Sequence, residues 1–132
     1  MVHTWKIAAL AASGLFASTT TANAETITVC ASGCDHTSIN AAIDVASDGD
    51  VIQLSAETYF EGAVIDTDGK AITLLGATDK GGNPVSILDG SESHHVLECS
   101  SKETGETVFQ NLVIQNANTD YYGGGMLLIV GL

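Results

Sequence analysis

The sequence predicts an all-β solenoid, in which the chain coils repeatedly and each coil buries apolar side chains on the next. Apolar residues in short β-type runs recur 22 residues apart, at Ile65, Ile87 and Phe109. A second, less regular series runs through Val51, Ile72 and Val96. After residue 50 no stretch has helical periodicity of any length, which disfavours alternating strands and helices. A fixed period of about twenty residues, made of strands and turns, is typical of stacked repeats.

Residues 1–24 are predicted to be a secretory signal peptide. A lysine precedes a stretch of small and apolar residues (7–16), and residues 22–24 read Ala-Asn-Ala, the small-x-small form that signal peptidase accepts. The apolar stretch is too short to cross the ~30 Å hydrocarbon layer as a membrane anchor. We therefore expect cleavage before Glu25, and a secreted or cell-surface protein with no membrane span after the signal is removed.

The remaining residues form at most one domain. Residues 25–126 are predicted to hold an N-terminal cap and the first coils of the solenoid, and residues 127–132 are an apolar end. This end is too short to cross a bilayer. Because an uncapped apolar end is typical of a solenoid that has been cut short, we interpret the sequence as the leading part of a longer one.

The charge balance is strongly acidic. The formal net charge is −12, from 4 Lys and Arg against 16 Asp and Glu, and arginine is absent. Such a surface repels phosphate backbones and anionic membranes, which disfavours nucleic acid as a partner. It suits an exported protein with a solvated acidic exterior, and divalent cations as screening partners.

The cysteines agree with export. Cys30 and Cys34 are separated by Ala-Ser-Gly, a loop that can close a small disulfide in an oxidising compartment. Zinc is the alternative, but this pair offers three ligands at best with His36, one fewer than a structural zinc site needs. Cys99 is left over, either as a buried thiol or with a partner outside this sequence.

One short amphipathic helix is predicted ahead of the first coil. Apolar residues follow the i, i+3, i+4, i+7 pattern of a single helical stripe of about three turns, at Ile39, Ala42, Ile43 and Ala46. Thr37 or Ser38 can cap its start, and Gly49 is expected to end it by adopting positive φ. Such a helix would cover the exposed interior and strand edge of the first coil.

The strands expected after an initial one at 25–30 alternate with polar corners. Glycine, Asn and Asp fall at those corners, where turns often need positive φ. The expected strands are 51–54, 63–65, 71–75, 85–88, 95–97, 107–109 and 111–116.

Several of these segments together resemble the opening of the pectin lyase-like superfamily, whose members are right-handed parallel β-helices. The first matching part is the predicted helix and the strand after it, at residues 37–44 and 47–52. The next two strand regions match at 69–74 and 86–90, and a late strand with its glycine bend matches at 109–116 and 123–125. It covers nearly all of residues 26–126. It implies a right-handed parallel β-helix with a short N-terminal capping helix.

What the resemblance implies about activity is limited, because the matching positions are turn formers and core residues. The family's enzymes act mostly on acidic polysaccharides, and its lyases use Ca²⁺ with a basic residue, commonly arginine. This chain has no arginine, and no catalytic residue can be placed by motif. We expect a polysaccharide-associated protein without a complete active site in this chain. If the longer parent protein is an enzyme, we expect a polysaccharide lyase or a related carbohydrate-active enzyme. The alternative is a non-catalytic surface or adhesin-type module.

Asp66, Asp68 and Gly69 form a D-x-D-G turn whose two carboxylates could share a Ca²⁺ ion. The same residues are also ordinary turn formers, and that reading is the stronger one. Asp48 and Asp50 flank a glycine in a similar way, but metal binding is less expected there because the glycine is needed to end the helix. Calcium is therefore the one cofactor that the sequence suggests.

Other polar and aromatic residues are weighed mainly as structural. His94 and His95 follow Asp89 and Glu92, but consecutive strand residues point to opposite faces, so the two imidazoles do not easily serve one site. Four aromatic residues could stack on sugar rings, although packing in the core or at a corner is the commoner role of such residues. They are Tyr59, Phe60, Tyr121 and Tyr122. Asn111 and Asn116 resemble the family's inward asparagines, which satisfy turn backbone groups.

Overall fold

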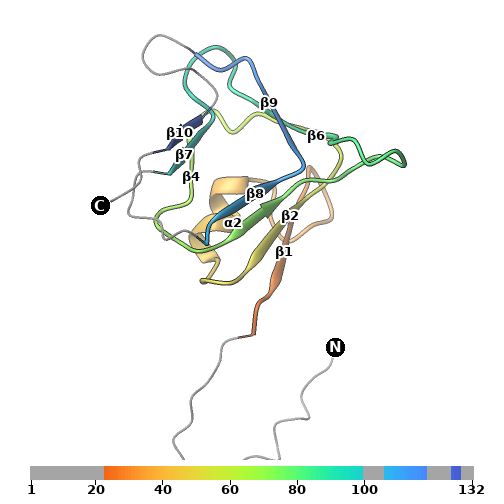
Figure 1. Cartoon of the computed structure of the whole chain (residues 1–132), viewed down its shortest axis with the longest axis vertical. Helices are drawn as coiled ribbons and strands as arrows, with labels where there is room; N and C mark the ends of the chain where they lie inside the picture. The colour runs from red at the N-terminus through yellow and green to blue at the C-terminus, as the bar shows by residue number, and fades with distance from the viewer. Residues whose placement is uncertain (1–22, 100–105, 119–125, 129–132) are drawn as a thin grey trace, which may run out of the picture.

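The computed structural model describes residues 23–99, 106–118 and 126–128. Within them the chain is a parallel β-solenoid with one short helix (Figure 1), as the sequence predicts. The elements are β1 (Thr26–Val29), α2 (Ile39–Val45), β2 (Val51–Leu54), β3 (Thr58–Tyr59), β4 (Ile65–Asp66), β5 (Thr73–Leu75), β6 (Ser86–Asp89), β7 (Leu97–Cys99), β8 (Val108–Gln110), β9 (Leu112–Gln115) and β10 (Met126–Leu128).

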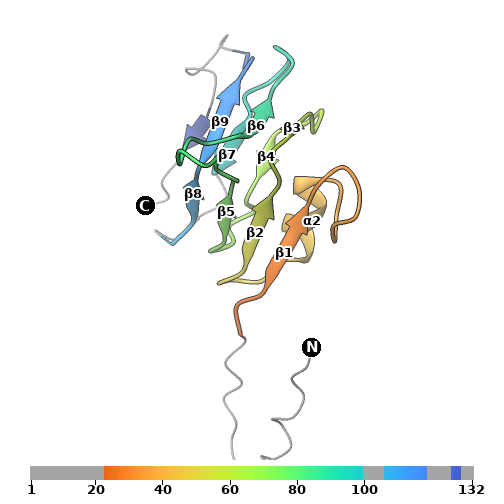
Figure 2. The same ribbon diagram turned by 90° about the vertical axis from the view of Figure 1, so that its right-hand side faces the viewer.

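Three strands make each coil, and each strand of a coil belongs to a different sheet. The first coil runs through β2, β3 and β4, the second through β5, β6 and β7, and the third through β8, β9 and β10. The sheets have the orders β1-β2-β5-β8, β3-β6-β9 and β4-β7-β10, and the paired strands are parallel. Figure 2 shows the coils stacked side by side, with β1 and α2 at the N-terminal end.

The register predicted from the interval of 22 residues is wrong. Ile65, Ile87 and Phe109 lie in β4, β6 and β8, which belong to three different sheets, so they do not stack on one another. The second series fails as well, since Val51 pairs with Thr73 and not with Ile72. The spacing of true partners varies because loops of different length join the strands. Ile52 and Leu74 are 74 − 52 = 22 residues apart, whereas Leu74 and Phe109 are 109 − 74 = 35 apart.

The core is built from columns of apolar side chains that repeat from coil to coil. Alternate residues of β2 and β5 point inward, as the burial of Ile52, Leu54 and Leu74 shows. The longest columns follow the registers of two sheets, namely Ile27-Ile52-Leu74-Phe109 and Tyr59-Leu88-Ile114. Burying these side chains supplies the main favourable term for stacking the coils.

Helix α2 lies against the first coil and contacts β1, β2 and β4 (Figure 1). Its capping residue is Ser38, whose Oγ accepts a hydrogen bond from the Ala41 amide at 3.2 Å. The predicted role of Gly49 is wrong, because the helix ends at Val45 with Ala46 as an extended C-cap. Gly49 does have positive φ (+95°), but it serves the turn before β2. The helix is therefore shorter than the three turns expected.

Two charged side chains from the following coil hold the ends of α2. Glu61 accepts hydrogen bonds from the Ser38 hydroxyl and from the amides of Ile39 and Asn40, at 2.7, 2.7 and 3.1 Å. Lys70 Nζ donates to the carbonyl oxygens of Ile43 and Asp44 at the opposite end. Each charge opposes the partial charge of the helix end it touches, and each satisfies backbone groups that a helix end leaves unpaired. These contacts fix the short helix on the solenoid.

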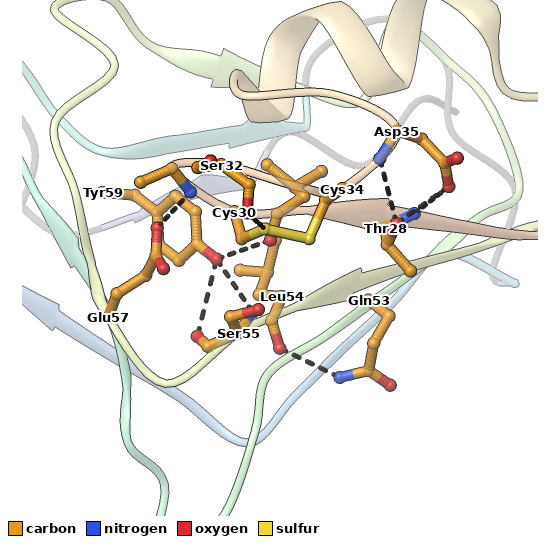
Figure 3. Close-up of a disulfide and its surroundings, with 12 residues drawn as sticks. Thr28, Cys30, Ser32, Cys34, Asp35, Gln53, Leu54, Ser55, Glu57 and Tyr59 are labelled. Carbon is orange, nitrogen blue, oxygen red and sulfur yellow. Dashed lines mark hydrogen bonds between the residues drawn. A yellow bond between two sulfur atoms is a disulfide. The ribbon is translucent and has the colours of Figure 1, made fainter.

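The predicted disulfide between Cys30 and Cys34 is present, and it shapes a loop that covers the edge of β1 (Figure 3). The Cys30 amide donates to the His36 carbonyl at 3.1 Å, and the His36 amide donates to the Thr28 carbonyl at 3.0 Å. The Thr28 amide and hydroxyl donate to the Asp35 carboxylate, which lowers the pKa of Asp35, the amide contributing more. The loop thus occupies groups that an edge strand would otherwise offer to another chain.

We predict that Glu61→Ala lowers the free energy of unfolding by about 1–2 kcal/mol, because three donors at the start of α2 lose their common acceptor. Chemical denaturation of the two proteins measures this difference. Glu106→Ala is the matched control, since it removes an exposed carboxylate with no such contacts. Equal losses in the two variants would contradict the capping role.

Replacing both Cys30 and Cys34 by alanine is expected to lower stability by about 2 kcal/mol, the chain-entropy value for so short a closed loop. Because the loop covers the edge of β1, the variant should also bind the amyloid dye thioflavin T faster on gentle heating. Cys99→Ala is the control, as it removes a thiol that forms no disulfide. Unchanged aggregation in the double variant would argue against the edge-covering role.

Candidate functional site

An open hollow of about 340 Å³ lies at the corner that follows the second sheet, and it is lined by Phe60, Asp89, Ser91, Glu92 and Asn116. These residues come from three successive coils. Phe60 directly follows β3, Asp89 ends β6, and Asn116 directly follows β9. Since β3, β6 and β9 stack in register, residues at or just beyond their ends lie close together, with Asp89 level with Gln115 and Asn116 one residue further on.

Asp89 is the central acceptor of this corner. Its Oδ2 accepts hydrogen bonds from the side-chain amides of Gln115 and Asn116, both at 2.8 Å, and its Oδ1 accepts from the Ser91 amide at 2.8 Å. The Gln115 amide, followed by the Ser91 backbone, holds the pKa of Asp89 below its usual range. The carboxylate is therefore ionised at neutral pH and fixed in orientation by the third coil.

The backbone around Asp89 adopts conformations that L residues rarely take. Ser91, Glu92 and Asn116 have φ values of +51°, +57° and +51°. The Glu92 amide donates to the Asn116 carbonyl at 2.6 Å, which ties the two turns together. At Gly90 a Cβ would lie 2.8 Å from the Asn116 carbonyl oxygen, so only glycine fits between the coils. Left-handed non-glycine residues cost energy and cluster at functional corners.

Phe60 and its neighbour Tyr59 have opposite environments. Tyr59 is 5% exposed, and its hydroxyl donates to the Val29 carbonyl at 2.8 Å, so it belongs to the core as the packing interpretation expects. Phe60 is 66% exposed, so it does not belong to the core. Its ring forms the apolar wall of the hollow, opposite the polar groups of the next two coils.

The predicted calcium residues form a turn. The Asp66 Oδ1 accepts a hydrogen bond from the Asp68 amide at 2.8 Å, and Asp68 has φ of +56°. Among the described residues, no group of three or more His, Cys, Asp and Glu side chains is arranged to hold a metal ion. Calcium at Asp66 and Asp68 therefore stays an untested prediction. Asp48 and Asp50 accept from backbone amides, including that of Ala71 at 2.9 Å from Asp48.

The two histidines lie near the hollow but do not line it. His94 Nδ1 lies 2.8 Å from the His95 carbonyl, and His95 Nε2 lies 3.1 Å from the Glu98 carboxylate. Both rings are half-buried. The two imidazoles thus have different partners, which agrees with the expectation that they do not serve one site, although neither is freely exposed.

Asn111 and Asn116, which the sequence analysis interprets as structural asparagines, lie at the corners that directly follow β8 and β9. Both have positive φ, and Asn116 is exposed with its amide on Asp89. Cys99 is a buried thiol whose sulfur accepts a hydrogen bond from the Thr67 hydroxyl at 3.7 Å.

Some predictions lie outside the described residues. They concern the leader up to residue 22, the aromatic residues Tyr121 and Tyr122 with the glycine bend, and residues 129–132.

No protein-family model, curated protein or solved structure matches this chain. The described residues include no helix with the length and hydrophobicity that crossing a bilayer requires.

The sequence pointed to parts of this site without assembling it. Phe60, Asp89, Glu92 and Asn116 each stood out as possible stacking, charged or turn residues, but the wrong register kept them apart. Ser91 gave no signal of its own. The register of the second sheet, in which Asp89 pairs with Gln115 and Asn116 comes one residue later, brings these residues together, and no local pattern in the sequence signalled it.

We predict that Asp89→Asn lowers the melting temperature at pH 7 and has a much smaller effect near pH 2. The folded-state pKa of Asp89 is lowered, so its ionised form stabilises the fold above the ordinary carboxyl pKa of 3.8. That contribution is lost as the pH falls through the lowered pKa. Thermal melts at both pH values test the prediction; a difference independent of pH would contradict it.

Proposed function

We propose that this is a secreted, polysaccharide-associated β-helix protein of the pectin lyase-like type, and that the hollow at Phe60 and Asp89 is its sugar-binding site. The observation that supports this most is the exposed aromatic ring beside an ionised, oriented carboxylate. An aromatic face packs against the C–H groups of a sugar ring, while carboxylates accept hydrogen bonds from its hydroxyl groups.

The rest of the hollow suits the same ligand. It is open, so a long polymer can pass over it without an end entering, and its lining combines one aromatic wall with the side chains of Glu92 and Asn116. The walls come from three coils, which gives a site that runs along the axis of the solenoid. Left-handed residues in the turn after Asp89 (Ser91 and Glu92) and in the next coil (Asn116) hold these groups in place at a conformational cost.

Charge decides which polysaccharides this site accepts. The ionised Asp89 and a net charge of −12 repel the carboxylates of an acidic polysaccharide. Binding of a uronate polymer should therefore depend on divalent cations such as Ca²⁺ placed between the two sets of carboxylates. Neutral polysaccharides should need no such cation.

The second candidate is a non-catalytic cell-surface or adhesin-type module. It is favoured by the state of Asp89, whose two oxygens already accept three hydrogen bonds within the protein. A general base must be able to take a proton from its substrate, and a carboxylate with a lowered pKa and three donors is poorly suited to that. Incubation with polygalacturonate and calcium, followed by ultraviolet absorbance of unsaturated product, separates the two: absorbance rises only if this chain is a lyase.

We predict that Phe60→Ala weakens polysaccharide binding about tenfold, the upper end of what one aromatic contact contributes. Affinity electrophoresis in gels containing a neutral polysaccharide, or polygalacturonate with and without Ca²⁺, measures the change. Val45→Ala is the matched control because Val45 is also exposed, at 59%, but lies outside this hollow. Equal retardation of both variants and the parent, or none for any polymer, would overturn the proposal.

A further inference from the structure

The fold begins at the residue that follows the predicted signal cleavage site. Asn23 and Ala24 are exposed and make no hydrogen bond within the part of the chain that the structure describes. Glu25 is bound on both sides: its amide nitrogen donates to Asp50 Oδ1 at 2.9 Å, and its carbonyl accepts from the Val51 amide at 2.8 Å. The boundary between unattached and attached backbone therefore coincides with the Ala24–Glu25 bond.

Asp50 is an unusual acceptor for this nitrogen. It is only 5% exposed, and its second oxygen accepts from the Ser47 amide at 2.8 Å. Its pKa is lowered chiefly by the Glu25 and Ser47 amides, with a smaller effect from the charge of Lys70. Lys70 itself donates to the end of α2, so the hydrogen-bond partners of this buried carboxylate are amides. Burying a carboxylate without a directly bonded cation is costly.

We propose that signal cleavage supplies the missing cation: the new α-ammonium of Glu25 forms an ion pair with Asp50 that fastens the first coil. Hydrolysis adds water across the peptide bond, so the C–N bond breaks, Ala24 leaves with the new carboxylate, and the Glu25 nitrogen becomes an ammonium at neutral pH. That nitrogen is already within hydrogen-bond distance of Asp50. An open hollow of about 280 Å³ beside it, lined in part by Val45 and Ser47, leaves room for the added protons.

The surrounding charges set the pH range of this ion pair. Lys70 opposes the ammonium, whereas Asp50, bonded to the nitrogen at 2.9 Å, and the side chain of Glu25 itself favour it. The pKa of the α-ammonium should therefore rise above its ordinary value of about 7.7–8.0. The added stability is present below that value and is lost as the pH rises through the raised pKa. This inference is independent of sugar binding.

The first experiment locates the chain end. The protein is expressed with its own leader in a secreting host, and the secreted product is sequenced from its N-terminus. A sequence beginning Glu-Thr-Ile-Thr is expected. A product that begins at any other residue overturns the proposal, because its ammonium would not coincide with the nitrogen that Asp50 binds.

The second experiment isolates the ion pair with four proteins. One pair begins at Glu25 or, one residue earlier, at Ala24, and the other pair has the same two ends with Asp50→Asn. At pH 6 the chain beginning at Glu25 should melt about 2–5 °C above the chain beginning at Ala24. The gap should close at pH 11 and be absent from the Asp50→Asn pair. No gap at pH 6, or an equal gap in both pairs, overturns the proposal.

A direct readout covers the case in which Asp50→Asn fails to fold. The pKa of the α-amine in the Glu25 protein is measured by nuclear magnetic resonance after ¹³C-methylation of its amines, which keeps their positive charge. We expect a value above the ordinary range, and an ordinary value in the chain that begins at Ala24. An ordinary pKa in both proteins overturns the proposal.

Discussion

The structure depends on the vertical stacking of like side chains from one coil to the next. Each coil alone exposes its apolar interior on two faces, and only contact with neighbouring coils buries it. The columns through Ile52 and Leu74 and through Tyr59 and Leu88 supply that contact, while the parallel hydrogen bonds between strands fix its register. The loops differ in length, and the strands still return to the same columns.

Because the first coil has no coil before it, its apolar interior and its strand edge need other covers. Helix α2 covers its interior, and the loop closed by the Cys30–Cys34 disulfide covers the edge of β1. Glu61 and Lys70 hold the two ends of the helix, and Glu57 accepts a hydrogen bond from the Ala31 amide of the loop at 2.8 Å. The acidic residues that give the chain its high net charge thus include several with defined structural partners.

The same stacking creates the candidate site. Residues at or just after the ends of β3, β6 and β9 meet at one corner, so an aromatic residue, a carboxylate and an amide from three coils line one hollow. Leu88, the residue before Asp89, is fully buried and anchors that corner to the core. A polymer lying along the solenoid axis would meet these groups one coil at a time, which is how repeat folds present extended ligands with a continuous surface.

The sequence by itself determined the class of fold, the position of the capping helix and the favoured disulfide, and it limited the helix cap to Thr37 or Ser38. Those features depend on local patterns: apolar periodicity, a capping hydroxyl and the short spacing of two cysteines. It did not determine the register, since loops of unequal length hide which residues stack, and a regular interval among Ile65, Ile87 and Phe109 was misleading. Only the tertiary structure decided that Phe60 faces solvent beside Asp89, and that Glu25 meets Asp50, because these contacts join residues about 25 or more positions apart through the pairing of strands.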